Sequence, residues 1–138
     1  MRRTAGYAAA AVAIFFLAGC YSEHPEENRY FPTVYAAEHQ SKAAALLRTA
    51  KLEEALAEAE LAVKDDPGFA AAAMTRATAL LRLQHLAEAR DALDTLCRQW
   101  PEMADAQALR GIACEKLDNT DESHAAYAAA VDAFDRQL

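Results

Sequence analysis

Small and apolar residues recur along the chain with two periods, one of a helical turn and a longer one of about 34 residues. Within a segment they fall three or four positions apart, as in Leu93, Leu96 and Cys97, which predicts an amphipathic helix. A shift by the longer period aligns small residues with small ones and apolar residues with apolar ones. The clearest columns are Ala43/Ala77/Gly111, Leu46/Leu80/Cys114, Ala55/Ala89/Ser123, Ala62/Leu96/Ala130 and Val63/Cys97/Val131. This register predicts one two-helix unit repeated three times between residues 36 and 138.

Turn residues and prolines mark the borders of the units. Pro67 and Pro101 lie one full period apart, and each is expected to end a second helix. The reason is that proline has no N–H to donate and disfavours helix in the residue before it. The predicted units span about residues 36–69, 70–103 and 104–138. Tight turns inside them are expected near Ala50-Lys51, Gln84-His85 and Asp118-Asn119.

The length of this period, the two small-residue columns and the closing proline resemble the tetratricopeptide repeat (TPR). The resemblance implies an all-α fold in which three tandem helix-turn-helix repeats form a short right-handed solenoid. Two columns depart from the family pattern. The column of the large aromatic in the first helix holds His39, Ala73 and Gln107. The residue before the first small column is often Leu in the family but is basic in this chain, as Lys42, Arg76 and Arg110.

The N-terminus carries the pattern of a secretion signal. Arg2 and Arg3 precede an apolar run over residues 8–18, which is shorter than the ~20 residues of a membrane span. The run ends in Leu17-Ala18-Gly19-Cys20, a tetrapeptide that resembles the lipobox of bacterial lipoproteins. The resemblance implies that residues 1–19 are a signal peptide and that Cys20 becomes the lipid-bearing first residue of the mature chain. An uncleaved anchor helix, or a signal cut without lipidation, is the alternative.

The segment after the signal is predicted to be a tether. Residues 20–35 begin at the lipid-bearing Cys20 and are mostly polar, with two prolines. Because Tyr21 rather than Asp follows Cys20, we expect a protein of the outer membrane that faces the periplasm. Tyr30, Phe31 and Tyr35 are too apolar for a plain linker. We expect them to pack on the first helix, with an exposed contact patch as the alternative.

The C-terminal end of the array has no separate solvating helix. Tyr127, Val131 and Phe134 lie at helical spacing in the last helix, where no further repeat follows to cover them. We therefore expect these side chains to be partly exposed. A partner, a dimer contact and a frayed end all remain open as the reason, and so does the oligomeric state.

Composition and missing motifs narrow the function classes. The chain has 14 Lys and Arg against 21 Asp and Glu, a formal net charge of −7, which argues against a nucleic-acid partner. No two of the four histidines stand at a metal-ligand spacing. The sequence also lacks a P-loop, a GxGxxG and a GxSxG motif. We therefore expect no enzymatic activity, no metal and no cofactor.

Two cysteines remain beside Cys20. Cys97 falls on the second helix of the second unit and Cys114 on the packing face of the next helix. Both stand in columns otherwise filled by Leu and Val, which favours two small buried core residues. An oxidising periplasm would also permit a Cys97–Cys114 disulfide, which stays the alternative.

Basic side chains concentrate on the first helices and acidic ones on the second. In the TPR fold the first helices line a concave groove, so the resemblance implies a groove that is basic despite the negative net charge. The bases concerned are Lys42, Arg48, Arg76, Arg82, Arg110 and Lys116. The predicted floor consists of Gln40, Ala44, Leu47, Met74, Thr78, Leu81, Ala108 and Ile112, and the basic row beside it of Arg48, Arg82 and Lys116. Solvated surface charges are the alternative.

These features predict a non-catalytic adaptor that is held in the envelope by its lipid. An apolar floor with a basic row suits an extended or helical peptide that carries carboxylates. The partner is expected to be another envelope protein or a peptide segment of it, as for pilotin-like assembly factors. The family's carboxylate clamp of Lys and Asn is not reproduced. A self-associating structural lipoprotein remains an alternative, and so does an immunity or inhibitor protein that uses the acidic second helices.

Overall fold

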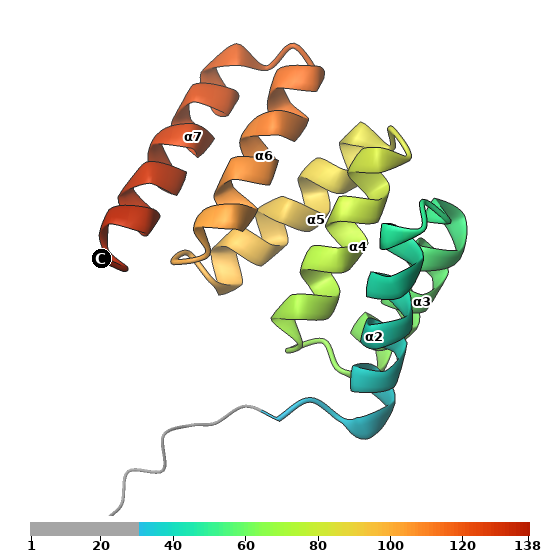
Figure 1. Cartoon of the computed structure of the whole chain (residues 1–138). Coiled ribbons are helices and arrows are strands. Elements are labelled where there is room, and N and C mark those ends of the chain that lie inside the picture. The colour runs from blue at the N-terminus through green and yellow to red at the C-terminus, as the bar shows by residue number, and fades with distance from the viewer. Residues whose placement is uncertain (1–30) are drawn as a thin grey trace, which may run out of the picture. The chain divides into compact units, whose positions relative to one another are not determined.

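The computed structural model describes residues 31–138, which form six helices in three antiparallel pairs (Figure 1). The predicted all-α fold of three helix-turn-helix units is confirmed, and residues from Pro32 to Leu138 make one compact unit. The predicted signal peptide, Cys20, Tyr30 and most of the predicted tether lie outside the described residues. Within the described part, no helix has the length and apolarity needed to cross a membrane. The helices are α2 (Val34–Arg48), α3 (Leu52–Asp65), α4 (Ala70–Arg82), α5 (Leu86–Gln99), α6 (Ala104–Lys116) and α7 (Thr120–Asp135).

Three turns of one design join the paired helices. Ala50, Gln84 and Asp118 each have a positive φ, of 58°, 64° and 61°. In each turn the next residue's N–H donates to the carbonyl oxygen five positions before it, which is the Schellman ending of a helix. The three bonds are Lys51 N to Leu46 O at 3.0 Å, His85 N to Leu80 O at 2.9 Å and Asn119 N to Cys114 O at 2.9 Å. The turns therefore recur at the predicted places, once in each repeat.

The small-residue columns lie where the helices pack most closely. All members of the columns Ala43/Ala77/Gly111 and Ala55/Ala89/Ser123 are buried. The largest fully buried side chains are Leu80, Leu93, Leu96 and Cys114. Small residues allow the backbones to approach, and these larger side chains fill the space between the pairs. The main hydrophobic cluster is formed by buried residues of α4, α5 and α6.

Apolar side chains are exposed at both ends of the array. The exposure was predicted at the C-terminal end but not at the N-terminal end. Tyr35 is 69% exposed, so the prediction that it packs on the first helix is wrong for this residue. The reason lies in the first turn of α2, where the fold buries Ala36 instead. At the other end Val131 and Phe134 are 60% and 55% exposed, as predicted, because α6 is the only described helix that packs on α7.

Candidate functional site

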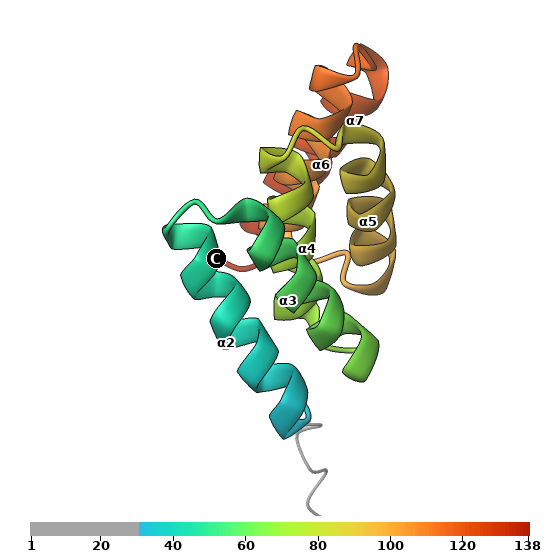
Figure 2. The same ribbon diagram turned by 90° about the vertical axis from the view of Figure 1, so that its right-hand side faces the viewer.

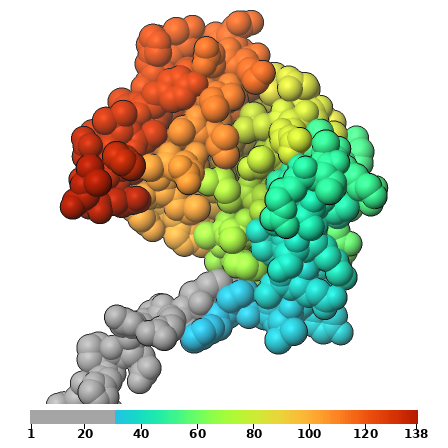
Figure 3. Space-filling model, viewed as in Figure 1, coloured from blue at the N-terminus to red at the C-terminus, as the bar shows by residue number. Residues whose placement is uncertain are grey.

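The first helices of the three pairs lie together on one face of the array, which we call the first-helix face. In Figure 2, α2 lies to the left of α3 and α4 lies to the left of α5, so each first helix lies to the same side of its partner. Helix α4 contacts both α2 and α6, and the space-filling view shows it between them (Figure 3). The predicted groove residues all fall on these three helices. Most of its floor is half-buried, as in Gln40, Ala44, Leu47, Met74, Thr78 and Ala108, whereas Ile112 is exposed and Leu81 belongs to the buried core.

A short polar seam joins α2 to α4 within this floor. Gln40 Nε2 donates to Thr75 Oγ1 at 2.8 Å, and Thr75 Oγ1 donates to the Ala71 carbonyl oxygen at 3.0 Å. Gln40 Oε1 is buried and has no hydrogen-bond partner among the described residues. A buried acceptor without a donor costs about 1–3 kcal/mol. A ligand N–H that reached this oxygen would remove that cost.

The three members of the basic row differ in their surroundings. Arg82 Nη1 donates to the Leu47 carbonyl oxygen at 2.6 Å, so its guanidinium caps the last turn of α2. Arg48 and Lys116 are exposed, and neither forms an ion pair within residues 31–138. Arg82 thus has a structural partner, whereas Arg48 and Lys116 are open to a ligand.

The other three basic residues of the first helices are each paired with an acidic side chain. This corrects the expectation that all six bases give the groove a positive charge. Arg76 Nε lies 3.6 Å from Glu60 Oε1, and Arg110 is paired with Asp94. Both acids stand on the second helix of the preceding repeat, and the two pairs occupy equivalent places in successive repeats. Lys42 has no repeat before it and pairs instead with Glu38 on α2 at 3.0 Å. The basic column that departs from the TPR pattern therefore forms ion pairs between and within repeats.

Among residues 31–138, the cysteines and histidines form no reactive cluster. Cys97 and Cys114 are buried free thiols, so the disulfide is not formed in this structure. Burial raises the pKa of both thiols, and Cys114 Sγ also donates to Glu122 Oε2 at 3.7 Å. His39 Nδ1 lies 2.6 Å from Glu58 Oε2. No group of three potential metal ligands occurs among the described residues.

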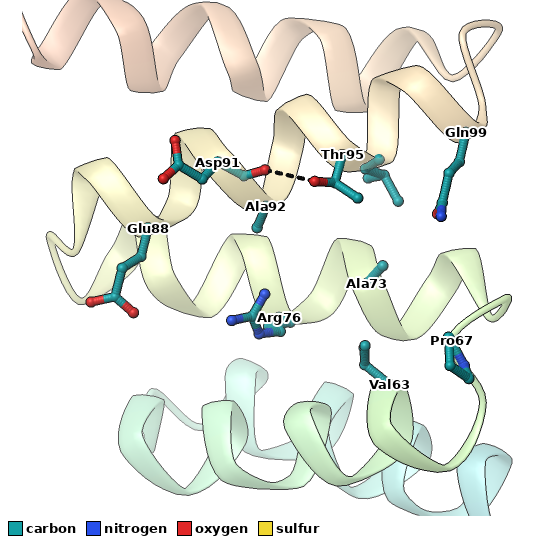
Figure 4. A pocket seen from close by; sticks show the side chains of 10 residues that line it. Val63, Pro67, Ala73, Arg76, Glu88, Asp91, Ala92, Thr95 and Gln99 are labelled. Carbon is teal, nitrogen blue, oxygen red and sulfur yellow. Dashed lines mark hydrogen bonds between the residues drawn. The ribbon is translucent and has the colours of Figure 1, made fainter.

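Two hollows on the side of the second helices were not foreseen from the sequence. The larger one, the α3–α5 hollow, has a volume of about 450 Å³ and is walled by α3, α4 and α5 (Figure 4). The smaller, of about 360 Å³, lies between α5 and α6. Three of its lining residues, Cys97, Gln107 and Arg110, stand one repeat after Val63, Ala73 and Arg76 of the larger hollow. The repeat register was the signal that could have related the two sites.

Comparison with known proteins supports the fold. No family model matches the chain, and no curated protein matches it. Among solved structures, the second TPR of Spaghetti (RPAP3) bound to the HSP90 peptide SRMEEVD has a TM-score of 0.69 at 20% identity, over 71% of this chain and 91% of that one. The first TPR of the same protein with the same peptide has a TM-score of 0.70 at 21% identity, over 72% and 79% of the chains.

The described residues have the TPR fold. MamA is a further similar structure, with a TM-score of 0.71 at 16% identity, covering 76% of this chain and 61% of that one. At this level of sequence identity, the similarity shows a shared TPR fold and indicates no particular ligand. The three pairs α2/α3, α4/α5 and α6/α7 are accordingly three TPR units.

Proposed function

We propose that this chain is a non-catalytic TPR adaptor, anchored by lipid at Cys20 in the bacterial outer membrane, that binds a segment of another periplasm-facing envelope protein. The tetrapeptide of residues 17–20 supports the anchor. The fold supports the binding role, since two TPR structures similar to this one are bound to a peptide. The observation that carries the choice of face is its half-buried floor beside Arg48 and Lys116, which form no ion pair in the described part of the chain.

The chemistry of that face favours an extended acidic segment. Arg48 and Lys116 occupy one column in the first and third repeats, so they flank the floor from either end of the array. Each offers a positive charge to a carboxylate of the ligand. On the same helix as Arg48, Gln40 Oε1 is a buried acceptor that has no donor among the described residues.

Charge reversal tests the face. In cells, the full chain carrying a photo-crosslinking residue at Ala44 should capture its partner, and Arg48→Glu with Lys116→Glu should reduce the capture roughly tenfold. The matched control is Lys51→Glu with Lys64→Glu, which changes the net charge equally on or beside α3. Equal loss with both pairs, or no loss with either, would remove the first-helix face from consideration.

The lipid anchor is tested separately. Cys20→Ser should abolish acylation and stop processing after residue 19, so that the chain accumulates as an unlipidated precursor of uncleaved size. Mass spectrometry of the N-terminal peptide is the measurement. An unmodified Cys20 in the mature protein would contradict the lipid anchor. It would leave the proposal that the first-helix face binds a partner unaffected.

Self-association is a second candidate because α7 leaves Val131 and Phe134 exposed. Sedimentation velocity over a range of concentrations is the test. A dimer that disappears with Val131→Asp and Phe134→Asp would support this candidate, whereas a monomer at all concentrations would dismiss it.

A further inference from the structure

The α3–α5 hollow has two chemically different ends. One end is lined by apolar side chains from three helices, among them Val63 on α3, Ala73 on α4, and Ala92 and Leu96 on α5. Glu88 and Asp91, both on α5, line the other end. Figure 4 shows the Glu88 carboxylate on the side of Arg76 and the Asp91 carboxylate pointing away from it. The hollow's volume of about 450 Å³ lies within the roughly 300–1,000 Å³ of sites that hold small ligands or side chains. An aliphatic group and a charged group can therefore occupy it together.

Carboxylates outnumber cations around this hollow. Its one basic lining residue, Arg76, is already held by Glu60 at 3.6 Å. Asp91 has Arg90 beside it, with Nη2 to Oδ1 at 2.9 Å. Glu88 forms no ion pair among the described residues. The acidic end of the hollow therefore has a carboxylate to offer to a cation.

The second helices around the hollow also carry mostly negative charge. The second helices α3, α5 and α7 carry twelve acidic and three basic residues, whereas the first helices α2, α4 and α6 carry three acidic and six basic ones. A positively charged segment is attracted to the acidic second helices, whereas Arg48 and Lys116 of the first-helix face, which form no ion pair within residues 31–138, repel it. The two sides thus differ in the ligands that they select.

We infer that the α3–α5 hollow is a second docking site, which binds a basic segment of a partner protein. In this site the cationic head of a Lys or Arg lies at Glu88, with Asp91 adding negative charge on the same helix, and an aliphatic neighbour covers Ala73, Ala92 and Leu96. The site is independent of the first-helix face and of the acidic ligand proposed there. A chain with both sites can bridge two partners, or two segments of one partner, of opposite charge.

Fluorescence anisotropy on the full chain in nonionic detergent tests the inference. The probe is a fluorescein-labelled peptide Gly-Leu-Arg-Ala-Leu-Arg-Gly, compared with the same peptide that has Glu in place of Arg. We expect the Arg peptide to bind more tightly, and added salt to weaken it. Glu88→Gln with Asp91→Asn should lower its affinity roughly tenfold. Ala92→Leu, which fills the apolar end, should also lower it.

Matched variants separate the hollow from general attraction to an acidic surface. Glu53→Gln with Glu54→Gln removes the same charge from the first turn of α3, outside the hollow, and should leave binding within about twofold. Arg48→Glu with Lys116→Glu should not weaken binding, which keeps this test distinct from that of the first-helix face. An equal loss with both acid-neutralising pairs, a preference for the Glu peptide, or no binding of either peptide would overturn the inference. Circular dichroism of each variant establishes that it is folded.

Discussion

The ring of Tyr127 lies in the space that a Cβ at residue 111 would need. A Cβ built on Gly111 would stand 2.6 Å from Tyr127 Cε1 and 2.7 Å from Cδ1. The equivalent positions in the earlier repeats pair Ala43 with Ala59, and Ala77 with Leu93. The third repeat therefore has Gly where the first two have Ala, because the side chain that faces it, Tyr127, is the largest of the three.

Gly111→Ala is expected to destabilise the protein by about 1–2 kcal/mol. Alanine in place of glycine within a helix ordinarily gains about 0.5–1 kcal/mol. Here overpacking costs about 1–3 kcal/mol, because the ring can move only by straining the 2.8 Å bond from Tyr127 Oη to Glu115 Oε2. Urea unfolding followed by circular dichroism is the measurement. Adding Tyr127→Leu, which copies the Ala77/Leu93 pair, should recover stability, and a single variant more stable than the parent would contradict the packing argument.

Glycine at the left-handed turn residues is expected to raise stability. Ala50 has a φ of 58°, a region that costs an L-residue about 1–2 kcal/mol, although glycine loses part of this gain through its unfolded-state entropy. We expect Ala50→Gly to raise the free energy of unfolding by about 0.5–1 kcal/mol. Asp118→Gly should gain less, because Asp tolerates this conformation better. Thermal unfolding measures both, with Ala45→Gly inside α2 as a destabilising control; a loss of stability in Ala50→Gly would refute the expectation.

The two ion pairs between repeats are expected to differ in strength. Arg110 and Asp94 are less exposed than Arg76 and Glu60, so water screens their interaction less. Double-mutant cycles with alanine should give a coupling of about 1 kcal/mol for Arg110 with Asp94 and about half that for Arg76 with Glu60. High salt should reduce the weaker coupling further. The reverse order of the two couplings would argue against burial as the cause.

The two buried thiols are expected to react slowly and to stay reduced. Because burial raises the pKa of Cys97 and Cys114, less thiolate is present at a given pH in the folded protein than in the unfolded chain. Stability from this source is complete below the ordinary thiol pKa of about 8.5 and falls as the pH rises above it. Pulse alkylation without reductant, read by mass spectrometry, should label both residues slowly in native protein and rapidly in urea. A chain that takes up no label until it is reduced would instead establish the disulfide.

Local rules made much of the fold predictable. Helix pairs follow from apolar residues at helical spacing, and their ends from Pro67, Pro101 and the polar turns. The burial of Ala43, Ala77 and Gly111 follows from their shared column. The positive φ of Ala50 does not follow from its own preference, since no glycine marks the turn. The packing of the two helices that it joins holds it in that conformation.

The candidate sites were less accessible to this reasoning, as two arginines of one helix illustrate. Arg76 and Arg82 both stand on α4, six positions apart, and the sequence assigned both to a basic groove. Arg76 instead pairs with Glu60 on α3, whereas Arg82 caps the Leu47 carbonyl on α2. A long flexible side chain can reach either flanking helix, and only the packed neighbours determine which partner it meets.

The sequence by itself determined the number of helices in the repeat region, their pairing and the columns that pack, because helix period, turn chemistry and proline act within a few residues and then recur in each repeat. Tertiary structure alone decided which charged side chains form ion pairs and which do not. It also decided where the second helices of successive repeats leave a hollow between them. These depend on distances between atoms of different helices, such as Asp94 and Arg110 or Val63 and Ala92, and no local pattern encodes such distances.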